Sequence, residues 1–117
     1  HQQTSEVKIP LATQNGLVFI KQNDIMYCES SGNYTQFYLA SNKQILVSRQ
    51  LGEYEKLLPE TQFIRIHDKH IINLQYLAEY IKGSGGEVKL DNGKIIPVAT
   101  RRKEELLHRF EKWLRRK

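Results

Sequence analysis

Residues 63–74 constrain the fold of this chain more than any other segment. Two apolar runs, 63–66 and 71–74, flank four polar residues at 67–70, two of which are histidines. Short apolar runs bounded by polar residues predict a strand, a tight loop and a second strand. Because the apolar residues anchor both flanks in a core, the polar loop is held on a fixed platform. The segment therefore predicts a β-rich fold that presents a recognition loop.

The length and composition favour a single domain. The chain has 117 residues, of which 39% are hydrophobic and 26% are charged, enough to build a core without a disulfide or a structural metal. The lone cysteine, Cys28, lies in an apolar run and is expected to be a buried hydrophobic residue. We assign residues 1–7 to a linker or remnant and residues 8–117 to the domain.

The sequence indicates neither a membrane protein nor a secreted one. No stretch approaches the roughly 18 apolar residues of a membrane span. The polar residues 1–6 lack the apolar segment of a secretory signal. We therefore expect a cytoplasmic location.

The positive charge is concentrated at the C-terminal end. Residues 1–100 contain ten Lys/Arg and ten Asp/Glu, whereas residues 101–117 contain eight and three, so the tail carries the whole net charge of +5. A basic end on a neutral body indicates a polyanion or an acidic protein surface as partner. A solvated helix face would give the same pattern.

Strands are predicted over most of the chain. Asn15-Gly16 favours a hairpin turn between 8–13 and 17–21, and Asn92-Gly93 favours another between 87–90 and 94–98. Alternating and aromatic patterns predict further strands at 24–30, 34–40, 44–48, 63–66, 71–74 and 77–82, with a glycine-rich turn at 83–86. The expected fold class is mostly β, with elongated, packed antiparallel β-sheets and two short helices.

Each helix is predicted from apolar spacing. The first has Leu51, Tyr54, Leu57 and Leu58 at helical intervals, with Ser48 as N-cap and Pro59 at its end. The second is an amphipathic C-terminal helix that we expect to dock on the sheets. Its predicted apolar stripe consists of Leu106, Leu107, Phe110, Trp113 and Leu114.

A cationic corner is predicted where the last helix begins. A helix that starts near Thr100 has Arg101, Arg102 and Lys103 in its first turn, where free amides already favour anions. Two arginines beside those amides suit a phosphate, and arginine also suits the edge of guanine. Polar loops at 29–34, 48–50 and 67–70 carry donors for phosphates or base edges. Spacing alone does not show whether these loops share a face.

Three segments, in order, carry a resemblance to a known family. They are 25–34, then 63–67 with 71–74, and finally 96–102. Together, a Phe-x-Arg-x-His run followed by Asn73 and a Pro-Val-x-x-Arg ending at Arg101 resemble the LytTR family of DNA-binding domains. The resemblance implies packed β-sheets and the output domain of a bacterial response regulator. It further implies that loops and the start of the last helix enter successive major grooves.

The resemblance also implies partners and contacts. The expected partner is double-stranded DNA with paired direct repeats, bound as a dimer that depends on an upstream receiver domain absent from this chain. The DNA-contacting positions fall on Asn33, Tyr34 and Thr35, on His67, Asp68 and Lys69, and on Arg101 and Arg102, to which we add Arg49 for its charge.

Two residues of the resemblance need separate comment. Relatives often have a basic or amide residue where this chain has Asp68, whose carboxylate repels phosphate. We expect Asp68 to accept from a cytosine amino group or to orient Lys69. Asn73 is expected to be structural, bracing the loop through hydrogen bonds to the backbone.

Other functions remain open on the residues alone. His67, Asp68 and His70 could belong to a zinc or catalytic site, although no glycine-rich phosphate loop, cysteine pair or catalytic carboxylate pair accompanies them. We therefore predict no enzyme and no cofactor. The basic C-terminal helix could bind an acidic protein, and Tyr34, Phe37 and Tyr38 could stack on single-stranded RNA.

Overall fold

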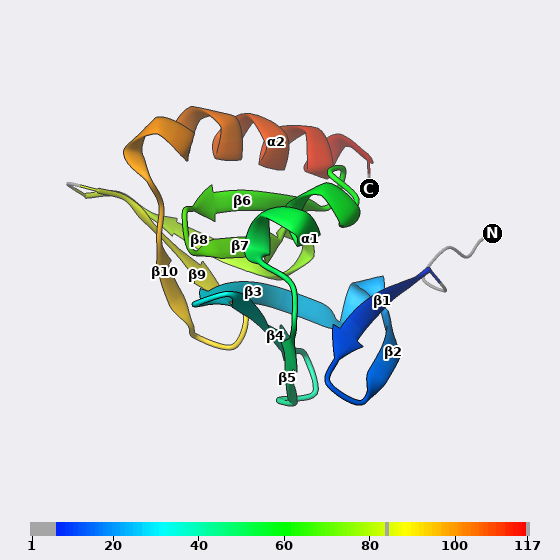
Figure 1. The fold of residues 1–117 in the computed structure, drawn as a ribbon. Helices are drawn as coiled ribbons and strands as arrows, with labels where there is room; N and C mark the ends of the chain where they lie inside the picture. Colours follow the sequence, from blue (N-terminus) through cyan, green and yellow to red (C-terminus); the bar gives the residue numbers. More distant parts are fainter. Residues whose placement is uncertain (1–6, 84, 117) are drawn as a thin grey trace.

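The computed structural model describes residues 7–83 and 85–116, and these form ten β-strands and two α-helices (Figure 1). The predicted fold class, mostly β with antiparallel sheets and two helices, is confirmed. Of the predicted linker 1–7, residues 1–6 lie outside the described residues, and Val7 is exposed just before the first strand. The strands are β1 Lys8–Thr13, β2 Gly16–Lys21, β3 Ile25–Ser31, β4 Tyr34–Leu39, β5 Gln44–Val47, β6 Phe63–His67, β7 His70–Asn73, β8 Leu77–Ile81, β9 Glu87–Leu90 and β10 Ile95–Pro97.

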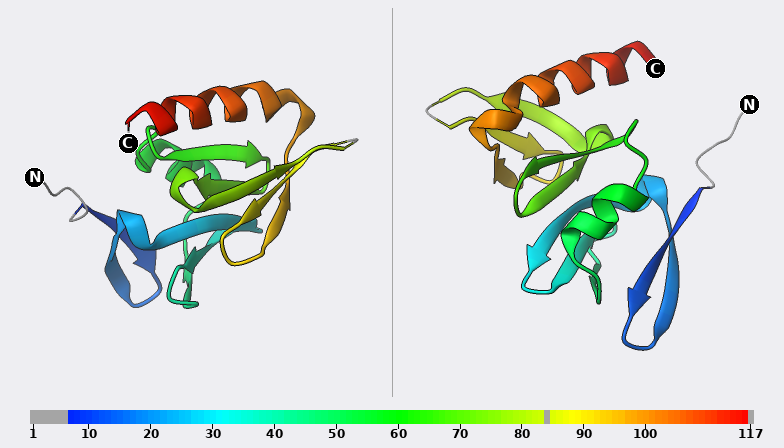
Figure 2. Two further views of the ribbon diagram at one scale, coloured as in Figure 1. Left: turned by 180° about the vertical axis from the view of Figure 1, so that it is seen from behind. Right: turned by 45° about the horizontal axis from the view of Figure 1, so that its top comes forward.

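The strands form three antiparallel sheets. The largest has five strands in the order β5-β4-β3-β7-β6, beside a three-stranded sheet β10-β9-β8 and the two-stranded hairpin β1-β2. Both predicted hairpins are confirmed, since β1 pairs with β2 and β9 with β10. Figure 2 shows α2 and the β1-β2 hairpin on opposite sides of the central sheet.

Two hydrophobic clusters lie on the two faces of the five-stranded sheet. Neighbouring residues of a strand point to opposite faces. Cys28 and Ile71 therefore join one cluster with Phe37 and Tyr54, whereas Tyr27 and Ile72 join the other. The second cluster includes Val88 of the three-stranded sheet and Leu106 of the last helix. Cys28 is fully buried, as predicted.

The first helix, α1 (Leu51–Leu57), packs Leu51 and Tyr54 into the first cluster. Its N-cap is Gln50, so the predicted Ser48 cap is wrong: the Ser48 hydroxyl donates instead to the carbonyl of Ala12, 3.3 Å away. Leu58 follows the helix with extended backbone before Pro59, the conformation that proline imposes on the residue before it.

The second helix, α2 (Lys103–Arg116), lies over the second cluster. Leu106 is buried, and Phe110 and Trp113 pack beside it. Leu107 and Leu114 are 46% and 55% exposed, so the predicted stripe is too wide. Each follows a contacting residue by one position, which turns it about 100° around the helix and away from the sheet.

The two histidines of the predicted loop are strand residues. His67 ends β6 and His70 begins β7, and the two pair across the turn formed by Asp68 and Lys69. His70 is buried, with 8% of its surface exposed, so the expectation that it is presented with the loop is wrong. A register shift between Arg65 and His67 bends this end of β6, as a β-bulge does.

Asn73 has the structural role that the sequence indicated. The side chain is fully buried; its amide donates to the carbonyl of Ile25, 2.9 Å away, and its oxygen accepts from the backbone N–H of Gln75 at 2.9 Å. These two bonds join the end of β7 to the beginning of β3 and to the turn that follows β7.

Replacing Asn73 by alanine leaves a buried carbonyl and an N–H group without their partners. We expect Asn73→Ala to lower the free energy of unfolding by about 2–4 kcal/mol, measured by urea denaturation. Asn92→Ala is the matched control, because Asn92 accepts a similar backbone bond from Lys94 in an exposed turn and should lose less than about 1 kcal/mol. Equal losses for the two variants would contradict the structural role.

Burial makes the fold sensitive to acid at His70. Desolvation lowers the pKa of His70 below its usual 6.5, opposed by Glu29 and assisted by His67, Lys94 and Lys69. Because the folded-state pKa is the lower one, the contribution of neutral His70 is complete above the unfolded pKa and is lost as the pH falls from there through the folded pKa.

We therefore expect the melting temperature of the wild type to fall between about pH 7.5 and about pH 5 by more than that of His70→Gln. His108→Gln, which changes an exposed histidine of α2, is the control and should keep the wild-type difference. The same difference in the wild type and in His70→Gln would refute the assignment.

Candidate nucleic-acid interface

One end of the five-stranded sheet brings the predicted loops together. Antiparallel pairing places the end of β3, the starts of β4 and β7 and the ends of β5 and β6 on the same side. The chain that enters α2 lies at this side too, because the N–H of Ala99 donates to the carbonyl of Ile66 at 2.8 Å. Figures 1 and 2 show the end of β6 and the start of α2 together in opposite views. We call residues 30–35, 48–50, 67–70 and 99–102 the loop edge.

Hydrogen bonds connect the segments of the loop edge in a row. The Gln50 amide donates to the side-chain oxygen of Asn33 at 3.1 Å. The backbone N–H of Ser30 donates to the carbonyl of Lys69 at 2.9 Å. An ion pair of 2.7 Å then joins Asp68 to Arg101. The four segments are therefore one continuous surface.

The β3-β4 turn presents Asn33 and Tyr34. Gly32 has φ of +63°, a left-handed conformation that glycine adopts without strain. Asn33 is exposed, and Tyr34 is 50% exposed. Thr35 is fully buried, and its hydroxyl donates to the carbonyl of Arg49 at 2.8 Å. The expectation of a DNA contact from the Thr35 side chain does not fit this position; the hydroxyl instead fixes the segment that carries the exposed Arg49.

The side chain of Arg65 stabilises the β6-β7 turn through hydrogen bonds to its backbone. Its guanidinium donates to the carbonyls of His67 and Asp68, at 3.3 and 2.6 Å, and to the carboxylate of Glu55 at 2.9 Å. His67 adds a bond of 3.2 Å by accepting from the N–H of Lys69. The Lys69 side chain is exposed, and no ion-pair partner for it lies within the described residues.

Asp68 pairs with Arg101 rather than with Lys69. One carboxylate oxygen accepts from Arg101 Nη2 at 2.7 Å, and both side chains are mostly exposed. The hydrogen bond and the positive charge of Arg101 lower the pKa of Asp68 below its usual value. The expectation that Asp68 orients Lys69 is therefore wrong.

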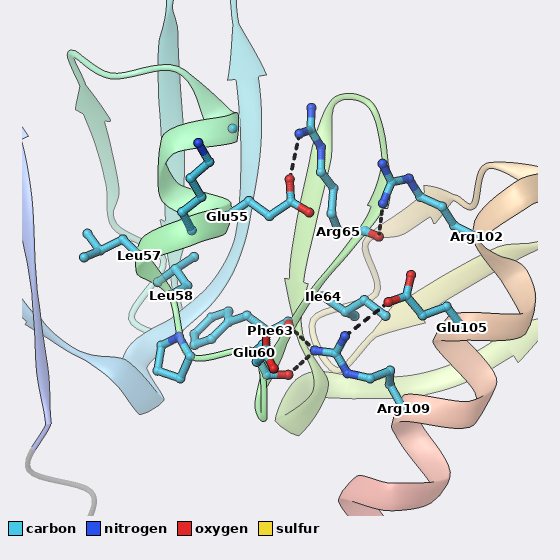
Figure 3. Close-up of a pocket in the computed structure, with 13 residues that line it drawn as sticks. Glu55, Leu57, Leu58, Glu60, Phe63, Ile64, Arg65, Arg102, Glu105 and Arg109 are labelled. Atoms are coloured by element: carbon cyan, nitrogen blue, oxygen red, sulfur yellow. Dashed lines mark hydrogen bonds and ion pairs between the residues drawn. The ribbon is translucent and has the colours of Figure 1, made fainter.

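Arg102 points away from Arg101, so the predicted corner of two arginines does not form. Both residues lie in the 3₁₀ turn Thr100–Arg102, in which successive side chains are about 120° apart. Arg102 donates to the carbonyl of Arg65 at 3.3 Å. It lines a cavity of about 740 Å³ between α1, β6 and α2, which Figure 3 shows. Its Nε is buried and has no hydrogen-bond partner among the described residues.

Two residues of the interface were missed or given a different role. Gln50 was not singled out, although a polar residue before a helix can reach a neighbouring turn. Arg65 forms an ion pair with Glu55, as an arginine on the surface of a strand often does, but it also binds two backbone carbonyls of the β6-β7 turn. The residue pattern carries no signal for this second role, because the register shift between Arg65 and His67 breaks the regular alternation of side chains along β6.

The alternative sites find less support in the side chains. Phe37 is buried, and Tyr38 stacks on Tyr27 with ring centroids 4.3 Å apart, so the proposed aromatic platform for RNA is not present. In the described part of the chain, no three His, Cys, Asp or Glu residues gather as a metal would require. Among the same residues, no helix is long and apolar enough to span a membrane.

Curated relatives of the chain are transcription regulators and a sensory transduction protein. It is 29% identical over 75 residues to the heme-containing CO-sensing transcriptional regulator RcoM 1 of Paraburkholderia xenovorans, covering 64% of this chain and 28% of that protein. It is 28% identical over 94 residues to the CO-responsive regulator RcoM of Rhodospirillum rubrum (78% and 39%) and 27% over 106 residues to the sensory transduction protein LytT of Bacillus subtilis (86% and 44%). The chain thus spans less than half the length of these relatives.

A solved structure and a family model agree with the fold. The solved structure is the LytTr DNA-binding domain of a Bacillus cereus protein described as a methyl-accepting/DNA response regulator. The TM-score is 0.73 at 25% identity, over 93% of this chain and 97% of that one. The model of the LytTr DNA-binding domain matches residues 15–111. The chain therefore belongs to the LytTr DNA-binding domain family.

Proposed function

We propose that this domain binds double-stranded DNA with sequence specificity through the loop edge and controls transcription as the output domain of a two-component response regulator. The observation that carries the proposal is the row of hydrogen bonds that joins Asn33, Lys69 and Arg101 through their segments. A surface of this kind combines groups for both parts of DNA recognition: cations for phosphates, and amide and guanidinium groups for base edges.

The exposed side chains differ in the part of DNA that each can bind. Arg49 and Lys69 suit phosphates, because each is an exposed cation next to a turn whose backbone is hydrogen-bonded. Arg101 suits a guanine edge and Asn33 an adenine edge. His67 and Tyr34 add a ring nitrogen and a phenol at the same edge.

The width of the loop edge supports contact with more than one groove. Four inter-strand spacings of about 4.8 Å separate β5 from β6, or about 19 Å, and Arg101 lies beyond β6. A major groove is about 12 Å wide, and one turn of the duplex is about 34 Å long. The edge is thus wider than one groove, so its two ends reach across a phosphate backbone towards neighbouring grooves.

We extend the proposal to a wider assembly, which the names of the relatives support. The Bacillus cereus protein is described as a response regulator, and the name of LytT refers to sensory transduction. We extend this to an upstream receiver domain and a dimer on paired direct repeats. Two weak modules gain affinity when they are tethered, so an isolated domain is expected to bind one half-site weakly.

Selection of bound duplexes from a random pool tests the specific part of this proposal. Enrichment of one motif, and of two copies in the same direction when the full-length regulator is used, is the expected result. A pool without enrichment would contradict sequence-specific binding.

The dependence on salt tests the assignment of charges. If Arg49 and Lys69 each neutralise a phosphate while Arg101 stays paired with Asp68, log K should fall against log salt with a slope of about −1.8. Lys69→Ala should make the slope shallower by about 0.9. Lys112→Ala, an exposed lysine on α2, should leave it unchanged. A shallower slope for Lys112→Ala together with an unchanged slope for Lys69→Ala would mean that α2, and not the loop edge, contacts the phosphates.

A further inference from the structure

Asp68 and Arg101 form an ion pair that the stability of the fold does not explain. They are 33 positions apart, on the β6-β7 turn and the 3₁₀ turn before α2, and their side chains are 73% and 62% exposed. Ion pairs with this exposure contribute little to stability, because water and salt screen them. In the structure, the pair places the guanidinium of Arg101 beside the carboxylate of Asp68 at the loop edge.

The contact leaves most of both groups available. Only Nη2 of Arg101 and Oδ1 of Asp68 take part. The remaining N–H groups of the guanidinium can still donate in parallel to a planar acceptor pair. Within the described residues, the second carboxylate oxygen of Asp68 has no hydrogen-bond partner, so it can accept from a ligand.

The backbone that carries the Asp68 carboxylate is held by hydrogen bonds that do not involve that carboxylate. Arg65 donates to the backbone carbonyls of His67 and Asp68, not to the Asp68 side chain. The turn therefore keeps its anchors when the carboxylate is removed. This separates the position of the backbone from the effect of the Asp68 side chain.

We propose that Asp68 is a positioning residue that aims Arg101 at a guanine edge, so that the pair reads a G·C base pair as one donor and acceptor unit. The proposal rests on the function proposed above and adds to it a preferred base and the residue that imposes the preference. Guanine presents two acceptors, O6 and N7, to Arg101, while the amino group of a cytosine in the same or the next pair can donate to the free oxygen of Asp68.

The sign of the charge supports a base rather than a phosphate as the target. A carboxylate beside Arg101 repels the phosphate backbone, so the pair is a poor phosphate site and a good match for the mixed donors and acceptors of the major groove. Arg101 holds the pKa of Asp68 below its usual value, so the carboxylate remains charged at neutral pH. Holding the guanidinium in advance also reduces the rotamer entropy that binding must otherwise remove.

The test measures how well each variant discriminates between a G·C and an A·T base pair, and not only how tightly it binds DNA. A duplex selected by the wild-type chain is compared with duplexes in which each G·C pair is replaced in turn by A·T. The variants are Asp68→Ala, Arg101→Ala, the double variant and Glu111→Ala. Glu111 is the matched control, because it is an exposed carboxylate paired with Arg115 near the other end of α2. Thermal unfolding confirms that each variant is folded.

We expect the wild type to disfavour replacement at one position on the order of tenfold or more. The discrimination ratio is the affinity for the selected duplex divided by the affinity for the duplex with that G·C pair replaced, and Asp68→Ala should lower it at least about threefold. The affinity of Asp68→Ala for an unrelated duplex should stay equal or rise, because a negative charge has been removed. Adding Asp68→Ala to Arg101→Ala should lower the ratio no further. Glu111→Ala should keep the wild-type ratio.

Four outcomes would overturn the inference. A wild-type ratio in Asp68→Ala contradicts positioning by Asp68, and so does an additive loss in the double variant. A uniform fall in affinity for all duplexes means that Asp68 is only structural. If the wild type itself binds all duplexes equally, the proposed function fails as well, which distinguishes this outcome from the other three.

Discussion

The pairing of β3 with β7 is the interaction on which the rest of the site depends. These strands are far apart in the sequence, yet the pairs Tyr27↔Ile72 and Glu29↔His70 place them side by side in the centre of the sheet. The register sets the β3-β4 turn next to the β6-β7 turn, and the bond from Ser30 to the Lys69 carbonyl joins them. A shift by one residue would also move each side chain to the other face. One register therefore fixes both the two cores and the loop edge.

The last helix, α2, completes the loop edge, because it covers the unpaired edge of β6. Among the described residues, the second edge of β6 has no strand partner, and open edges favour aggregation. Arg102 and Arg109 donate to the carbonyls of Arg65 and Phe63 along this edge. Because Leu106 is anchored in the core one turn into α2, the helix begins beside the β6-β7 turn. The same docking that protects the strand thus brings Arg101 to the loop edge.

The sequence predicts local features well and long-range ones poorly. Asn15-Gly16 and Asn92-Gly93 determine hairpins through backbone preferences of a few residues, and both hairpins form. The burial of Thr35 and His70 depends on which face each strand presents, which the pairing decides. Arg101 and Arg102 diverge because successive side chains of a helical turn point about 100–120° apart, and Arg65 spans the β6-β7 turn because its side chain is long. The family resemblance predicted which loops carry the DNA-contacting positions, but it did not predict the hydrogen bonds and the ion pair that connect these loops.

The most direct test of a shared DNA-binding edge is the mapping of amide chemical shifts while a selected duplex is added. The account predicts that the largest changes fall on the loop edge, residues 30–35, 48–50, 67–70 and 99–102. The β1-β2 hairpin and the C-terminal half of α2 should change little. Changes confined to residues 108–116, or to the hairpin, with the loop edge unaffected, would contradict it.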